Sequence, residues 1–164
     1  EYVSRPELGA APLRASASRT SGDVTINSTS WMNVDTGLDL TLAANPGDVI
    51  EVLLVGSMAG ITAGSDCFLD AMCVNSSAYF TTPNANASTK SYSSWMAYPA
   101  STGATGSPII GMPRRRTLVA GDISGGLVVV RLRAILSAGT NQVINADATN
   151  QLYWEAVNLG PAGP

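Results

Sequence analysis

Short alternations of apolar and polar residues, broken by Gly, Pro, Asn and Asp, follow one another from residue 22 onward. An alternation with a period of two places every second side chain on one face, as in a β-strand that covers a core. The segments that read as strands are 23–27, 38–42, 49–55, 67–74, 91–98, 117–120, 127–136 and 151–159. No segment shows a long helical period, and the chain has no internal repeat. About eight strands at this spacing predict an all-β fold, an antiparallel β-sandwich of jelly-roll type.

The alternation also predicts which side chains face the core. The strand expected over 127–136 shows this most clearly, because Arg131 and Arg133 alternate there with apolar residues. Asn45-Pro-Gly-Asp, which separates two of the strands, has Pro and Gly at positions that suit a tight turn. The core positions expected in the clearest strands are Leu38, Leu40, Leu42, Ile50, Val52, Leu54, Val128, Val130, Leu132, Ala134, Leu136, Leu152, Trp154 and Ala156.

Composition divides the chain into three parts. Residues 1–20 contain several Ala, Ser and Pro residues without a strong period, so we expect an extended N-terminal arm. Residues 21–160 form the expected β-sandwich domain, and a chain of 164 residues lies within the size range of a single domain. Residues 161–164 are expected to form a Pro/Gly tail or the start of a linker.

The N-terminal arm carries apolar residues although it lacks a strand pattern. Val3, Leu8 and Leu13 are spaced so that they can lie in a groove. We therefore expect these side chains to pack on another protein, and the arm to attach the domain to it.

Charged residues make up only 13% of the chain, whereas hydrophobic residues make up 45%. An ordinary soluble domain has about 25% charged residues, so we expect part of this surface to be buried against other subunits. The segment 127–135 adds to this expectation because it has apolar residues on both faces. We therefore expect a homo-oligomer, in particular a homotrimer. The interface residues expected in it are Leu127, Val129, Arg131, Arg133 and Ile135.

The net charge of −3 argues against a nucleic-acid-binding protein, because neutralising phosphate needs clustered Lys and Arg. The dense charge run Pro113-Arg-Arg-Arg can be read as a patch for nucleic acid or acidic lipid. It can also be read as a solvated strand edge, or as arginines that pair with acidic residues of a neighbouring subunit. The negative net charge favours these last two readings. No apolar run approaches ~20 residues, so we expect no membrane-spanning segment.

The chain contains no histidine. This excludes Ser-His-Asp and Cys-His nucleophilic systems, zinc sites that use His, and imidazole acid–base catalysis. Two carboxylates could hydrolyse a glycoside, but nothing in the spacing pairs any two of them. Calcium could be held by Asp35 with Asp39 or by Asn145 with Asp147, but neither pair matches the EF-hand loop. We therefore predict no catalytic residue, no cofactor and no metal site, and hence a protein that is not an enzyme.

Cys67 and Cys73 are six residues apart in Cys-Phe-Leu-Asp-Ala-Met-Cys. If this run is one strand, the two side chains lie on the same face about 20 Å apart. A disulfide needs Cα atoms within about 7 Å, so a disulfide within one straight strand is excluded. We expect two small buried side chains, as in a protein assembled in a reducing compartment.

A Ser-rich loop region carries Tyr92, Trp95 and Tyr98. Aromatic faces in such a loop can stack on a sugar ring, which makes these three the candidate glycan-binding residues. The alternative reading is that they pin a long loop to the body of the domain.

Four segments of the chain resemble minor tail proteins and other virion surface proteins of actinobacterial phages. The segments are EYVSRPELGA at 1–10, TINSTSWMNVDTGLDLTL at 25–42, GDVIEV at 47–52 and YWEAVNLGP at 153–161. The resemblance implies a β-sandwich head domain, often trimeric, that is displayed on the particle. Fibre-type members of this family often continue into collagen-like stretches, which the terminal Gly-Pro-Ala-Gly-Pro fits. None of these segments is a catalytic signature, so no catalytic residue is carried over.

These observations predict a structural component of a phage virion: a minor tail protein, a tail-fibre head or a capsid decoration protein. We expect it on the virion surface after assembly in the host cytoplasm, where it acts by protein–protein contact and by host adhesion. The expected partners are copies of the chain, other virion proteins contacted through the arm, and a host-surface glycan, but neither nucleic acid nor membrane. The alternatives are a carbohydrate-binding module that recognises a host cell-wall glycan and a glycan-degrading enzyme.

Overall fold

A computed structural model describes residues 13–60, 66–81, 95–97, 107–109, 112–137, 141–147 and 149–163. This part of the chain contains β-strands and two 3-10 turns, and no α-helix. The elements are β1 Arg14–Arg19, β2 Val24–Ile26, β3 Met32–Asn33, η1 Thr36–Leu38, β4 Leu40–Ala43, β5 Asp48–Val55, β6 Ser57–Gly60, β7 Cys67–Cys73, β8 Ala78–Tyr79, β9 Trp95–Ala97, β10 Ser107–Pro108, β11 Arg114–Thr117, η2 Ala120–Asp122, β12 Ile123–Ser124, β13 Leu127–Leu136, β14 Gln142–Ile144 and β15 Leu152–Pro161. No helix among the described residues is long and apolar enough to cross a membrane.

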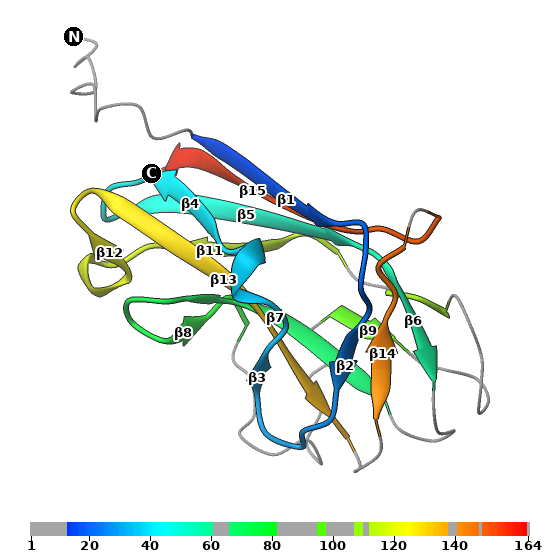
Figure 1. Ribbon diagram of the computed structural model, residues 1–164. Coiled ribbons are helices and arrows are strands. Elements are labelled where there is room, and N and C mark those ends of the chain that lie inside the picture. Colours follow the sequence, from blue (N-terminus) through cyan, green and yellow to red (C-terminus); the bar gives the residue numbers. More distant parts are fainter. Residues whose placement is uncertain are drawn as a thin grey trace, which may run out of the picture.

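The strands form two layers that pack face to face (Figure 1). The first sheet has the strand order β1-β15-β5-β11, and the second sheet has the order β10-β6-β14-β2. Because β1, β5 and β15 adjoin β2, β6 and β14 along the chain, the second sheet prolongs the first beyond a bend. The third sheet has the order β12-β13-β7-β8, with β3 and β4 paired to β13 and β9 paired to β7. It forms the opposite layer, which confirms the predicted antiparallel β-sandwich of jelly-roll type.

The bend between the first two sheets lies at Gly56, the single residue that separates β5 from β6. A Cβ atom added to Gly56 would lie 3.0 Å from Cδ1 of Leu152 and 3.1 Å from Cδ1 of Ile109. Both distances are shorter than the ~3.5–4.0 Å of a relaxed carbon–carbon contact. The missing side chain therefore allows the strand to turn against the core at this point.

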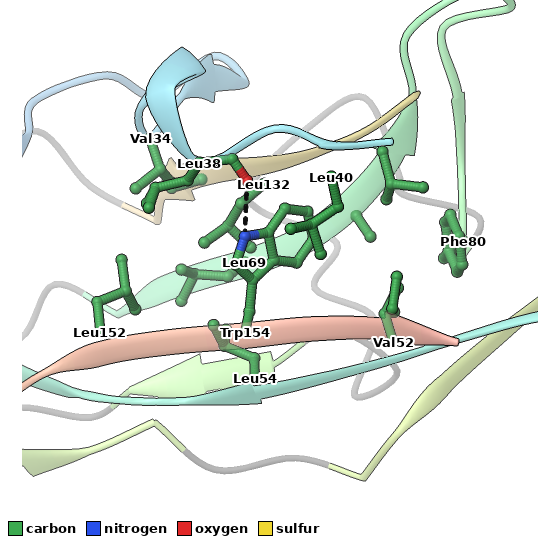
Figure 2. Close-up of a cluster of buried hydrophobic side chains, with 14 of the residues drawn as sticks. Val34, Leu38, Leu40, Val52, Leu54, Leu69, Phe80, Leu132, Leu152 and Trp154 are labelled. Atoms are coloured by element: carbon green, nitrogen blue, oxygen red, sulfur yellow. Dashed lines mark hydrogen bonds between the residues drawn. The ribbon is translucent and has the colours of Figure 1, made fainter. Parts of the chain in front are cut away.

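Trp154 lies at the centre of the core between the first and third sheets and has no exposed surface. Its indole N–H donates a hydrogen bond of 2.8 Å to the carbonyl of Leu38 (Figure 2), so the buried donor is satisfied. Around it, side chains from the first sheet and from the opposite layer point toward one another. Those that surround it in Figure 2 include Val34, Leu40, Val52, Leu54, Leu69, Phe80, Leu132 and Leu152.

The predicted core faces are confirmed, because every core position expected from the alternation is at most 4% exposed. The predicted Asn45-Pro-Gly-Asp turn is also present, with Gly47 at a φ of 91°. Cys67 and Cys73 are both buried and free, as expected. Burial raises the pKa of the Cys73 thiol to about 12, and it raises the pKa of Cys67 as well. Both thiols therefore stay protonated and unreactive.

The N-terminal arm expected over residues 1–20 is wrong in its second half. Residues 14–19 form β1, which pairs along its whole length with β15. Ala15 and Ala17 pack against the core, whereas the residues between them face outward. An alternation of Ala with Ser and Arg changes little in hydrophobicity, which is why it does not read as a strand in the sequence.

Two further boundaries differ from the prediction. The strand expected over 117–120 is instead β11, which ends at Thr117 and is followed by the 3-10 turn η2. The tail expected from residue 161 begins one residue later, because Pro161 is still part of β15. Six strands of two to four residues were not predicted, because a period is hard to recognise over so short a stretch. These short strands are β3, β6, β8, β10, β12 and β14.

Candidate interaction surface

The outer face of the first sheet is formed by the side chains that alternate with the core positions of its four strands. The two central strands, β5 and β15, place mostly apolar residues on it, and the two edge strands place polar residues. The central residues are Val49, Glu51, Leu53, Val55, Tyr153, Glu155, Val157 and Leu159, and the edge residues are Arg14, Ser16, Ser18, Arg115 and Thr117. Val55 and Leu159 are 54% and 50% exposed, so this face presents apolar surface to its surroundings.

The charges on this face are neutralised by pairs within it. Nη2 of Arg14 lies 2.7 Å from Oε2 of Glu155, and Nε of Arg115 lies 2.6 Å from Oε2 of Glu51. The hydroxyl of Tyr153 also donates to Glu155, at 2.7 Å. Hydrogen bonds from Tyr153 and Arg14 hold the pKa of Glu155 below its usual value. The outer face of the first sheet therefore combines an apolar centre with polar edges and no net charge.

The interface residues predicted on β13 have a different environment. Ile135 is only 2% exposed and packs with Phe68 and Trp31 of the same chain, so it offers no free surface. Arg131 forms a pair of hydrogen bonds with the carboxylate of Asp39. Leu127 and Val129 are partly buried, as is Arg133, which donates to the carbonyl of Trp31. The predicted set therefore does not form one exposed surface, and the prediction is wrong for Ile135, which is buried within its own chain.

A cluster of polar and aromatic side chains lies beside Ile135 on the third sheet. The rings of Trp31 and Tyr79 lie 5.1 Å apart at an angle of 45°. Nη1 of Arg133 lies 3.5 Å from the sulfur of Met72. Nε of Arg133 and the indole nitrogen of Trp31 are buried and have no hydrogen-bond acceptor. Because both atoms are out of reach of a ligand, we interpret this cluster as packing and not as a binding site.

The arginine run forms the edge strand β11, and its residues Arg115 and Arg116 form ion pairs with acidic residues of the same chain. Arg116 reaches the fully buried carboxylate of Asp122 with contacts of 3.0 to 3.1 Å. Burial alone would raise the pKa of Asp122, but hydrogen bonds from Ser76 and Val119 and the charge of Arg116 together lower it. With Arg115 bound to a glutamate of the same sheet, the predicted strand edge is confirmed, and its acidic partners belong to the same chain.

Asp35 and Asp147, which were considered as calcium ligands, form hydrogen bonds, and in the case of Asp35 an ion pair, within the chain. Asp35 accepts from the backbone of Gly37 and pairs with Arg19, and Asp147 accepts backbone N–H groups of residues 149 and 150. Among the described residues, no group of three or more acidic or Cys side chains could hold a metal ion.

Several of the other predicted site residues fall outside the described residues. These are Tyr92 and Tyr98 of the candidate glycan loop and Val3 and Leu8 of the arm. The backbone of Trp95 lies in β9, opposite Leu69 of β7. Leu13 is 48% exposed, and its carbonyl accepts a hydrogen bond from the backbone of the first sheet. Of these residues the structure therefore describes only Leu13 and the backbone of Trp95, so the glycan-binding loop and the attachment arm stay predictions.

The outer face of the first sheet was not predicted, although the sequence carries a signal for it. In 49–55 and 152–159, apolar residues occur on both faces of the strand, not only on the core face. The alternation over 127–136 is longer, and for that reason the interface was predicted there and not on these two segments.

Comparison of the sequence with protein-family models and with curated proteins finds no match. Among solved structures, the chain is similar to Eiger TNF from S. frugiperda, with a TM-score of 0.48 and 12% identity over 94% of this chain and 96% of that one. It is similar to a chain of infectious bursal disease virus, Gx strain, with a TM-score of 0.40 and 14% identity over 92% of this chain and 30% of that one. A third is in the T13 particle of the same virus, with a TM-score of 0.34 and 11% identity over 93% and 37% of the two chains. These similarities concern the course of the chain and not its function.

Proposed function

We propose that this protein is a structural component of a virion, displayed on the particle surface, and that it acts by assembling with other proteins rather than by catalysis. The observation that carries the proposal is the outer face of the first sheet. An apolar centre with a polar rim is the anatomy of a protein–protein interface. The resemblance to virion surface proteins supports the same role, and one of the segments that carry it, 153–161, lies within β15.

The way in which ion pairs are used also suits a structural role. Partly buried pairs join connecting segments to the strands, so that the domain presents its outer faces in a fixed arrangement. These pairs are Arg19 with Asp35, Arg116 with Asp122, and Arg131 with Asp39. Pairs of this kind hold geometry more than they add stability, because desolvation offsets much of their attraction.

The proposal leaves two positions on the particle, which differ in copy number. A capsid decoration protein covers a lattice and is present in many copies, whereas a minor tail protein or tail-fibre head is present in a few. In either position, we propose that the residues before β1 attach the sandwich to another virion protein.

The experiment that tests the role is quantitative protein analysis of purified particles, by gel densitometry or mass spectrometry. We expect the chain to be retained through density-gradient purification, at a fixed number of copies per major capsid protein. That number assigns it to the capsid or to the tail. A protein that is made during infection but absent from purified particles would contradict a virion role.

A further inference from the structure

We propose that the outer face of the first sheet is covered by the same face of a second copy of this chain. This inference rests on the proposed assembly role and names the partner for one surface. The contact would place β5 and β15 of one protomer against β5 and β15 of another around a symmetry axis, as closed homo-oligomers do.

The centre of the outer face is mostly apolar. Six of the eight outward side chains of the two central strands are Val, Leu or Tyr. In a single chain several of these remain in contact with water, as the exposure of Val55 and Leu159 shows. Covering them removes apolar surface from water, which is the main favourable term in association.

The area of the outer face can be compared with the area that a stable contact between two copies buries. Four strands at about 4.8 Å spacing and about seven residues at about 3.3 Å per residue give a footprint of roughly 19 by 23 Å. The accessible surface of a footprint of roughly 440 Å² is larger than the footprint itself, because side chains stand out from it. Stable interfaces begin at about 600 Å² of accessible surface per partner, so a contact over the whole face lies near the lower limit for a stable contact between two copies.

The charges on the outer face favour a copy of the chain over a strongly charged partner. Arg14 and Arg115 are each bound to a glutamate of the same face, so two copies meet without like-charge repulsion. A strongly charged partner would find no complementary charge there. A face that neutralises its own charges is complementary to itself.

The opposite layer does not present an equal apolar surface to a second copy. The outward residues of β7, which are Phe68, Asp70 and Met72, are all buried within the chain, as is Ile135 of the neighbouring strand. A contact between copies is therefore directed to the first sheet.

The test is the mass of the full chain in solution by size-exclusion chromatography with light scattering, at high micromolar concentration. Because the same face meets on both copies, the contact has twofold symmetry, and we expect a dimer of twice the single-chain mass of 16.9 kDa. Leu53→Asp places a charge at the centre of the face and should reduce the mass to that of one chain, with an unchanged far-ultraviolet spectrum. Ser16→Arg, at an exposed edge position, removes no packing and should weaken the oligomer in the same direction.

The matched control is Thr41→Asp, an exposed position on the third sheet opposite Val129. It adds the same charge to the other layer and should leave the mass unchanged. A wild-type chain that stays monomeric overturns the inference. So does an oligomer that survives both face variants or dissociates with the control.

The outcome also separates this inference from the proposed function. A monomer in solution that is nevertheless found in purified particles ends the self-contact and leaves the virion role, with another virion protein as the occupant of the face. An oligomer in solution that is absent from particles does the reverse.

Discussion

Asp70 lies in the middle of β7, a strand whose seven residues are all buried. Its carboxylate accepts hydrogen bonds from the backbone of Ala71 and from the backbone and hydroxyl of Thr81. These bonds favour the charged form, but burial is the larger effect and raises the pKa of Asp70 to about 6. An aspartate in an unfolded chain has a pKa of about 3.9, so the folded state holds this proton more tightly.

This difference predicts that the protein becomes more stable on mild acidification. Between about pH 4 and 6 the folded state binds more protons than the unfolded state, so the free energy of unfolding falls as the pH rises through this range. From pH 7.5 to 5 we expect a gain on the order of 1–2 kcal/mol, which urea unfolding at the two pH values measures. Glu155 and Asp122, whose pKa values are lowered, lose their contribution only at lower pH.

Asp70→Asn is the control for this prediction, because it removes the titrating group. The chain has no histidine, so no imidazole titrates in the same range. The pH dependence should disappear in the variant. Equal stability of the wild-type protein at pH 5 and 7.5, or a dependence that persists in Asp70→Asn, would show that Asp70 is not the cause.

Gly56 gives a second prediction at the scale of one residue. Ala at this position would press on the side chains of Leu152 and Ile109 at 3.0 and 3.1 Å. We expect Gly56→Ala to destabilise the fold by about 1–3 kcal/mol, as overpacking of a core does. Gly121→Ala is the matched control, because a Cβ atom there meets nothing within 4 Å. Thermal unfolding of the two variants measures the difference, and similar melting temperatures would contradict the close contact.

At the scale of the element, two properties decide what can be predicted from the sequence. These are the length of a strand and the difference in hydrophobicity between its two faces. The strands β5, β13 and β15 are long, and charged residues alternate there with apolar core residues, so their core faces follow from the period. β1 has six residues, but its inward side chains are Ala15, Ala17 and Arg19, and these differ too little in hydrophobicity from its outward side chains for the pattern to read as a strand. The short strands β3, β10 and β14 are defined by backbone pairing with segments far away in the sequence, which no local pattern records.

The strand β1 also carries a prediction about truncation. Removing residues 1–19 exposes one side of β15 and the core surface under the two alanines. We expect this deletion to lower the melting temperature by more than 5 °C, the shift that about 2 kcal/mol produces in a domain of this size. Removing residues 1–12 leaves β1 whole and is the control. If both deletions melt alike, the pairing of β1 does not stabilise the sandwich.

At the scale of the whole molecule, a low proportion of charge predicts surface that is buried against a partner, but it does not predict which surface that is. In the sequence, β13 has the longest run with apolar residues on both sides. The structure shows that part of that second side is covered by the chain itself, through Phe68 and Trp31. Which face is already covered depends on contacts between distant segments, so it becomes visible only when the layers are assembled.

The arginine run at the edge of the first sheet limits how such a molecule can aggregate. β11 is an edge strand, and two of its arginines, Arg114 and Arg116, point inward, while Arg115 lies on the outer face. A foreign strand that extended the sheet at this edge would have to desolvate these guanidinium groups, which is one way in which proteins prevent growth by strand addition. A contact between the outer faces of two first sheets adds no further copies once the two faces cover each other. Copies of this chain should therefore not grow into a fibril by strand addition at the β11 edge.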